Sequence, residues 1–343
     1  MNNRSFRRPY ISLVLPFVLA ACAGGGGVNE PEVFVERPTL QPFDAGAANV
    51  KKHADTDNYF TVSTNGGAVE KYTVTTKEKS SWSDSYYDVN KDVTVYKTPD
   101  GKYYQFGNFN TPIVPDYSSP SKQFLTSHEM QATEDGGKIF ACCDSYHTDR
   151  PAIDMRGTMY YGAWISPKGE ASLFAGGSLA DAAYMQGGSE AKGAKGKATY
   201  DVWGIRVKDG KVVSSSYTPK NPHNADAPTV ISQLTVNFNT GKLGGEIIGN
   251  KDFGSSVIMK DVNVNGNKFS GTATSGEATG QVEGAFFGAH RKSYYSGGIS
   301  EYGGKSIGGT VKFDGNKALD TAFGGTRTAI DTETKSTDLT PLK

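Results

Sequence analysis

The feature that most constrains the fold of this chain is a long series of short segments in which apolar and polar residues alternate. Alternation with a period of two is typical of β-strands that bury one face. In the second half of the chain these segments recur about every ten residues, which is typical of sandwiches and up-and-down barrels. They lie at residues 234–238, 243–248, 256–264, 269–274, 281–287, 294–300, 309–313 and 322–326. The sequence therefore predicts an all-β fold.

Glycine and aromatic residues support this prediction. The 343 residues include 42 glycines, 18 tyrosines and 17 phenylalanines. Glycine beside aromatic residues suits a sheet that coils sharply, as a small closed barrel requires. Where two tyrosines are adjacent in a predicted strand, as at Tyr160 and Tyr161, we expect one ring to face the core and the other to face outward.

Charge and hydropathy exclude two classes of protein. The 36 Lys and Arg residues balance 36 Asp and Glu residues, which argues against a nucleic-acid partner. The mean hydropathy of −0.47 argues against a protein with several membrane-spanning helices.

Two turn signals in the first half of the chain predict β-hairpins. Residues 59–63 and 71–75 flank an Asn-Gly-Gly turn, and residues 93–96 and 103–106 flank a Pro-Asp-Gly turn. Asn-Gly between strand-like segments is the strongest short-range hairpin signal. An aromatic segment with Trp82 lies between these two pairs.

Residues 1–21 resemble the signal peptide of a bacterial lipoprotein. A basic start and an apolar run at residues 11–20, too short for a stable membrane anchor, lead to Leu-Ala-Ala-Cys, which ends at Cys22. In bacterial lipoproteins the cysteine at this place is acylated and becomes the mature N-terminus. The resemblance implies the same for Cys22, with its acyl chains in membrane lipid. The alternative is an ordinary cleaved signal with a chance cysteine.

The residues after Cys22 predict a tether. Ala23 stands where an Asp commonly retains lipoproteins in the inner membrane, so we expect sorting to the outer membrane. Four glycines and several prolines follow, and such composition forms flexible or extended linkers. Residues 22–46 are therefore expected to join the acylated cysteine to a folded body.

Ordered motifs within residues 231–327 resemble the C-terminal barrel of a family of surface lipoproteins. The motifs are LTVNF, GKLGGEI, NKFSGTA, VEGAFFG, YSGGIS and FGGTR. The barrel is similar to the one shared by transferrin-binding protein B, factor H-binding protein and the haemoglobin–haptoglobin-utilisation lipoprotein, which are exported through Slam-type translocons. Ala289 stands where the family often has Pro, and Ser296 stands where it usually has Glu.

The resemblance implies a domain layout. We expect a handle-like or sandwich-like N-terminal β-sheet domain at residues 47–153 and an eight-stranded antiparallel β-barrel at residues 154–330. A polar tail at residues 331–343 is expected to be frayed. Transferrin-binding protein B has two such lobes and is much longer, so the layout is most similar to the haemoglobin–haptoglobin-utilisation lipoproteins.

The resemblance also implies a function. It predicts a non-enzymatic receptor on the outer-membrane surface of a Gram-negative bacterium. The receptor captures a host haem or iron carrier, haemoglobin or haemoglobin–haptoglobin first, and passes the cargo to a TonB-dependent transporter. No cofactor is expected in this chain, with haem either carried by the partner or bound weakly. Transferrin or complement factor H are alternative ligands, and a structural or adhesive lipoprotein is the alternative of another class.

Several loop residues are candidates for binding a partner. Trp82, Tyr86 and Tyr87 belong to an expected loop tip, where exposed aromatic residues commonly dominate binding; the alternative is that they pack under the loop. The other candidates are a basic turn, read either as solvated or as a contact for an acidic partner, and two residues near a cysteine pair. They are His290, Arg291 and Lys292 in the turn, and Tyr146 and His147 near the cysteines.

Cys142 and Cys143 are the only cysteines besides Cys22. Adjacent cysteines in an exported protein can form a vicinal disulfide that shapes a surface loop. Two reduced thiols, or a disulfide to another molecule, are the other possibilities.

No catalytic motif occurs in the sequence. It lacks G-x-S-x-G, H-E-x-x-H and phosphate-loop patterns, and its five histidines lack the spacing of a metal site. We therefore expect neither an enzyme nor a metal protein.

Overall fold

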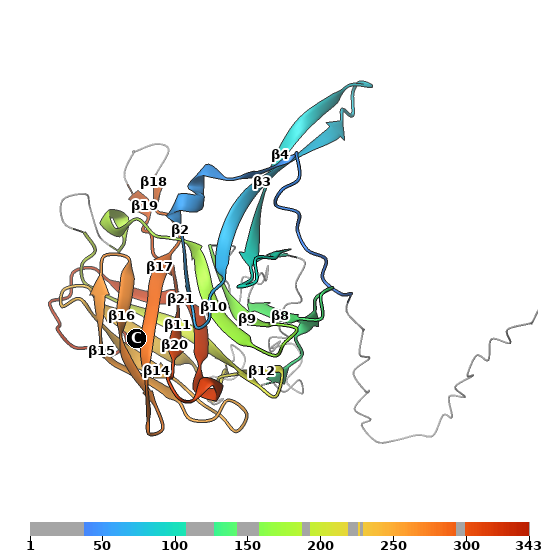
Figure 1. Ribbon diagram of the computed structural model, residues 1–343. Coiled ribbons are helices and arrows are strands. Elements are labelled where there is room, and N and C mark those ends of the chain that lie inside the picture. The colour runs from blue at the N-terminus through green and yellow to red at the C-terminus, as the bar shows by residue number, and fades with distance from the viewer. Residues whose placement is uncertain are drawn as a thin grey trace, which may run out of the picture. The chain divides into compact units, whose positions relative to one another are not determined.

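The computed structural model describes residues 38–107, 127–142, 158–186, 193–218, 226, 229–292 and 299–342 (Figure 1). Their regular secondary structure is almost entirely β-strand, as predicted. The only helices among them are three 3-10 turns, η1 (Ala54–Asn58), η2 (Ala182–Tyr184) and η3 (Lys317–Leu319). None of these has the length that a membrane-spanning helix needs.

Two antiparallel sheets form the N-terminal part. The outer sheet has the order β1-β3-β4-β5, and the middle sheet has the order β2-β10-β9-β8-β7. The outer strands are β1 (Val50–Lys52), β3 (Ala68–Lys79), β4 (Tyr86–Lys97) and β5 (Tyr103–Gln105). The middle strands are β2 (Tyr59–Ser63), β7 (Gln131–Ala132), β8 (Lys138–Cys142), β9 (Met159–Ile165) and β10 (Ala171–Ser178).

The C-terminal part is the predicted eight-stranded antiparallel barrel. Its order is β13-β14-β15-β16-β17-β20-β21-β11, and the pairing of β11 with β13 closes it. The barrel strands are β11 (Lys197–Lys208), β13 (Ser232–Asn237), β14 (Lys242–Ile247), β15 (Val257–Asn265), β16 (Lys268–Ser275), β17 (Ala278–Phe287), β20 (Ser306–Lys312) and β21 (Thr321–Asp331). The short strands β12 (Lys211–Ser214) and β6 (Ser127–His128) extend β11 at one edge, and β18 (Arg291–Lys292) pairs with β19 (Ile299–Glu301).

The middle sheet lies between the outer sheet and the barrel. One of its faces shares a core with the barrel, in which Tyr161 packs with Trp203. Its other face shares a core with the outer sheet, in which Tyr160 stacks on Phe106 at 3.9 Å between ring centroids. Tyr160 and Tyr161 are therefore both buried. The expectation that one of them faces outward is wrong, because this sheet is covered on both sides.

The hairpin predicted at the Asn-Gly-Gly turn is also wrong. β2 pairs with β10, and β3 pairs with β1 and β4, so the turn carries the chain from the middle sheet into the outer sheet. Gly66 and Gly67 both have positive φ, and a Cβ on Gly67 would lie 2.3 Å from the hydroxyl oxygen of Tyr96. The second predicted hairpin is confirmed, with β4 paired to β5.

Two further features differ from the expected domain layout. Strands β9 and β10 belong to the middle sheet, although the predicted boundary after residue 153 groups them with the barrel. The expected fraying of the tail is wrong for residues 332–342, which are fastened to the barrel. Asn237 Nδ2 donates to the carbonyls of Ser336 and Asp338 at 2.8 and 3.0 Å. Buried Lys197 also pairs with Asp338 at 2.8 Å.

Candidate functional site

The β3–β4 hairpin extends beyond the outer sheet as a two-stranded ribbon. Its twelve residue pairs run from Ala68–Lys97 to Lys79–Tyr86. β1 pairs only as far as Val74 and β5 pairs only near the other end, so the outer half of the hairpin has no third strand. Figure 1 shows this ribbon standing clear of the other strands. We call residues 74–91 the ribbon.

The tip of the ribbon carries three exposed aromatic side chains. Trp82 is 95% exposed, Tyr86 is 64% exposed and Tyr87 is 52% exposed. The alternative that these rings pack under the loop is therefore wrong. The other large apolar side chains exposed in the described part of the chain are Ile258 and Ile330, both on the barrel. A group of exposed rings with few rotatable bonds is typical of a protein-binding site.

Cross-strand pairs stabilise the ribbon, which would be marginal as an isolated two-stranded element. Thr75 Oγ1 donates to Asn90 Oδ1 at 2.8 Å, and Lys77 Nζ lies 3.7 Å from Asp88 Oδ1. At the tip, Lys79 Nζ lies 2.8 Å from Asp84 Oδ1. These pairs hold the two strands in one register, so the tip is presented on a defined support.

A charged cluster ties the base of the ribbon to η1. Lys71 Nζ donates to Asp92 Oδ2 at 2.8 Å, and this hydrogen bond lowers the pKa of the Asp92 carboxyl. His53 Nε2 lies 3.4 Å from the same oxygen, while His53 Nδ1 accepts the N–H of Asp55 at 3.0 Å. The cluster therefore connects β3, β4 and the residues around η1 where the ribbon begins.

The other predicted contact residues lie on different elements. The His290 ring lies 4.2 Å from the Tyr184 ring, and Arg291 is exposed with its Nε 3.5 Å from Glu301 Oε2. Lys292 follows in β18. The structure thus brings together Trp82, Tyr86 and Tyr87, but it places His290 and Arg291 beside η2 and β19.

Cys142 is buried at the end of β8 and takes part in a disulfide. The remaining predicted site residues, Cys22, Cys143, Tyr146 and His147, lie outside the described residues.

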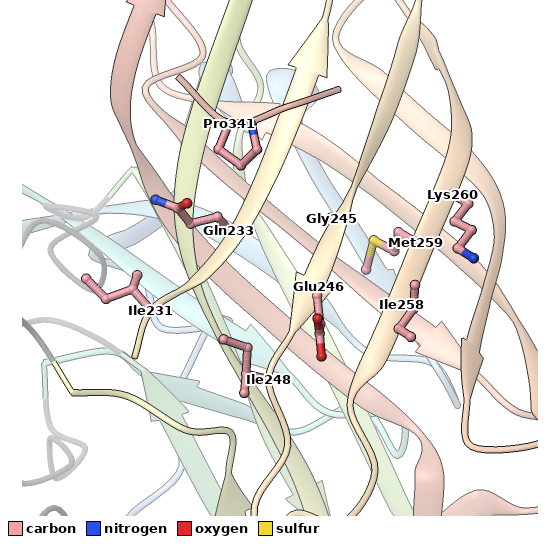
Figure 2. Close-up of a pocket in the computed structure, with 9 residues that line it drawn as sticks. All are labelled: Ile231, Gln233, Gly245, Glu246, Ile248, Ile258, Met259, Lys260 and Pro341. Carbon is pink, nitrogen blue, oxygen red and sulfur yellow. The ribbon is translucent and has the colours of Figure 1, made fainter. Parts of the chain in front are cut away.

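A second candidate is a hollow of about 430 Å³ on the barrel wall. Figure 2 shows side chains from β13, β14, β15 and the C-terminal tail around it. Its lining is Ile231, Gln233, Gly245, Glu246, Ile248, Ile258, Met259, Lys260 and Pro341. The three isoleucines of the lining offer an apolar surface, and Glu246 and Lys260 are its only charged residues.

Within the described ranges no three His, Cys, Asp or Glu side chains come together as a metal site. Two further residues of the ribbon, Val74 and Val89, lie on the same face as Tyr87 and were not among the candidates from the sequence. The alternation of Tyr87, Val89, Lys91 and Val93 along β4 was the signal that could have identified that face.

Comparisons with known proteins converge on one family. Residues 92–342 match the profile of the family described as "HpuA: Haemoglobin-haptoglobin utilisation, porphyrin transporter". No curated protein sequence matches the chain.

Two solved structures are similar over most of the chain. One is HpuA from Kingella denitrificans in complex with human haemoglobin, at 42% identity and a TM-score of 0.78, covering 90% of this chain and 100% of that one. The other is the apo haemoglobin receptor HpuA of the same organism, at 42% identity and a TM-score of 0.80, covering 90% and 99%. A transferrin-binding protein B mutant from Haemophilus parasuis also matches, at 12% identity and a TM-score of 0.41, covering 76% and 54%.

Proposed function

This chain belongs to the HpuA family of haemoglobin–haptoglobin utilisation proteins, and from that membership we propose that it is a receptor that captures haemoglobin. The observation that carries the proposal is the solved complex of a 42% identical relative with human haemoglobin, which matches 90% of this chain. Capture requires a surface that recognises a folded protein and releases it again. It does not require a reaction at a bound substrate.

The ribbon supplies such a surface. Trp82 is almost fully exposed at its tip, and a tryptophan that becomes buried on binding contributes strongly to affinity. The cross-strand pairs hold the ribbon in a defined conformation before binding, which reduces the entropy that association costs. We infer that Trp82 anchors haemoglobin and that the body of the protein supports the ribbon.

The proposal includes where the receptor works. An acylated Cys22 would attach the chain to the outer membrane after export through a Slam-type translocon, and the residues that follow it would tether the folded body. The expected tether at residues 22–46 is too long, because residues 38–46 belong to the folded body: Leu40 is buried, and the N–H of Phe43 donates to the carbonyl of Tyr103 at 2.7 Å. Haem would travel with haemoglobin, and a TonB-dependent transporter would take it up. The protein itself would not be an enzyme, and any haem would be carried by the partner or bound weakly.

Titration calorimetry with the purified full chain tests this function. Human haemoglobin is titrated into the protein in detergent, with transferrin and complement factor H as parallel ligands. The proposal expects saturable binding of haemoglobin and none of the other two. Binding of transferrin or factor H instead would assign the receptor to an alternative ligand. Binding of none of the three would favour a structural or adhesive lipoprotein.

A further inference from the structure

A haemoglobin-binding ribbon can contact its partner in only a few ways. Beyond Thr75 the edges of β3 and β4 in the ribbon have no third strand, and such edges can recruit an extended segment of another protein. Globin chains, however, are packed from helices and offer no strand for that purpose. If haemoglobin is the partner, as the proposed function holds, the contact must use side chains on one face of the ribbon.

The two faces of the ribbon differ in chemistry. Lys77, Asp88, Thr75 and Asn90 point to one face, which we call the paired face. Their side chains already bond across the strands, Thr75 to Asn90 and Lys77 to Asp88. Covering this face with a partner would desolvate ions and polar groups that gain no better bond, which is unfavourable.

The opposite face, which we call the apolar face, carries Val74, Val89 and Tyr87. It continues the face of β3 that carries Tyr72, which is buried beside the rings of Phe43 and Tyr103. Val74 and Val89 are half-buried. One ion pair crosses this face, with Lys91 Nζ 2.8 Å from Glu78 Oε1, and both of its side chains are exposed. Covering this face removes apolar area from water, which is favourable.

The area that a stable complex buries also indicates that haemoglobin contacts one face of the ribbon in addition to the tip. Tyr86 and Tyr87 are neighbours on one strand and point to opposite faces, so a single partner surface takes only one of them together with Trp82. Two aromatic side chains bury about 400 Å². A typical stable interface needs about 800 Å² from each partner. Val89, the next residue along this face from Tyr87, and Val74, opposite Lys91, extend the contact on the apolar face alone.

We propose that haemoglobin lies along the apolar face of the ribbon, against Tyr87, Val89 and Val74, with Trp82 at the end of the contact. The paired face, which includes Tyr86 and Asn90, remains in solvent in the complex. The proposal rests on the proposed function and specifies which side of the ribbon performs it.

Neighbouring residues on β4 provide matched variants for the test. Tyr87→Ala and Val89→Lys change the apolar face, whereas Tyr86→Ala and Asn90→Lys make the same kinds of change on the paired face. Human haemoglobin binding is measured by titration calorimetry on full-length variants in detergent, and thermal unfolding reports whether each variant is folded. We expect the apolar-face variants to raise the Kd at least about tenfold and the paired-face variants to raise it less than about threefold.

The possible results distinguish a wrong face assignment from a wrong proposed function. Equal effects on the two faces, no effect on either, or a larger effect on the paired face would overturn the face assignment while haemoglobin capture stands. Failure of the unmodified chain to bind haemoglobin would overturn the proposed function and, with it, the face assignment. If Val89→Lys unfolds the protein, the comparison of Tyr87→Ala with Tyr86→Ala decides alone, because both rings are more than half exposed.

Discussion

At the scale of single residues, Trp82 is the side chain whose exposure has the clearest functional meaning. Because it is 95% exposed, it contributes little packing to the fold. We expect Trp82→Ala to weaken haemoglobin binding about tenfold or more and to leave the thermal midpoint unchanged. Surface plasmon resonance and thermal unfolding measure the two quantities. Ile330→Ala, which removes an exposed apolar side chain from the barrel, is the control and should not alter binding.

Asp135 gives a prediction about acid stability. Burial would raise the pKa of its carboxyl, but hydrogen bonds from Lys102, Thr133 and the N–H of Gly137 outweigh burial and lower the pKa to about 2. A lowered pKa in the folded state stabilises the fold above the unfolded value near 4, and this contribution is lost as the pH falls toward 2. It amounts to at most about 2 kcal/mol.

Asp135→Asn should therefore be less stable than the unmodified protein at pH 7, with the difference shrinking between pH 4 and pH 2. Urea unfolding of both proteins across this range measures it. A stability difference that does not change over these pH values would contradict the assignment.

A substitution at Gly67 tests the turn that carries the chain from the middle sheet into the outer sheet. Gly67→Ala would place a Cβ in a positive-φ residue and 2.3 Å from the Tyr96 hydroxyl oxygen. Gly101 also has positive φ, but a Cβ there meets nothing within 4 Å. We expect Gly101→Ala to cost about 1 kcal/mol of unfolding free energy and Gly67→Ala to cost about 1–3 kcal/mol more. Denaturant unfolding compares them, and equal losses would argue against the close approach to Tyr96.

At the scale of elements, the sequence predicted most strands but not all of their partners. Alternation and turn residues are local, so they located β2, β3, β4 and β5 and paired the last two correctly. The Asn-Gly-Gly turn showed that the chain reverses, but it could not show that β2 pairs with β10, which is more than a hundred residues away. The same limit explains the domain boundary, because the assignment of β9 and β10 depends on which sheet they join.

The C-terminal tail packs against the barrel, which its polar composition did not predict. Leu339 approaches Gly244 so closely that a Cβ on the glycine would lie 2.9 Å from Leu339 Cδ1, and Asn237 holds two tail carbonyls. Truncation after Asp331 should therefore lower the thermal midpoint by about 3–6 °C, from the loss of about 1–2 kcal/mol of hydrogen bonding. Differential scanning calorimetry of the truncated and full chains measures the shift. An unchanged midpoint would mean that the tail does not stabilise the barrel.

At the scale of the whole molecule, the all-β class, the eight-stranded barrel and the family were all predictable from the sequence. The barrel motifs are runs of neighbouring residues, and a sequence displays such runs directly. The candidate site was predictable only in part. Three aromatic residues in a row of polar ones marked the ribbon tip, but which residues lie on each ribbon face depends on the pairing of β3 with β4.

At this scale we propose that the ribbon is the part of the chain that binds haemoglobin. The most direct measurement is the affinity of the full chain for human haemoglobin, with and without the outer half of the ribbon. The shortened protein replaces residues 76–89 by an Asn-Gly turn and keeps both sheets and the barrel. We expect saturable binding by the full chain and at least about a hundredfold weaker binding by the shortened one. Equal affinity of the two proteins would contradict it.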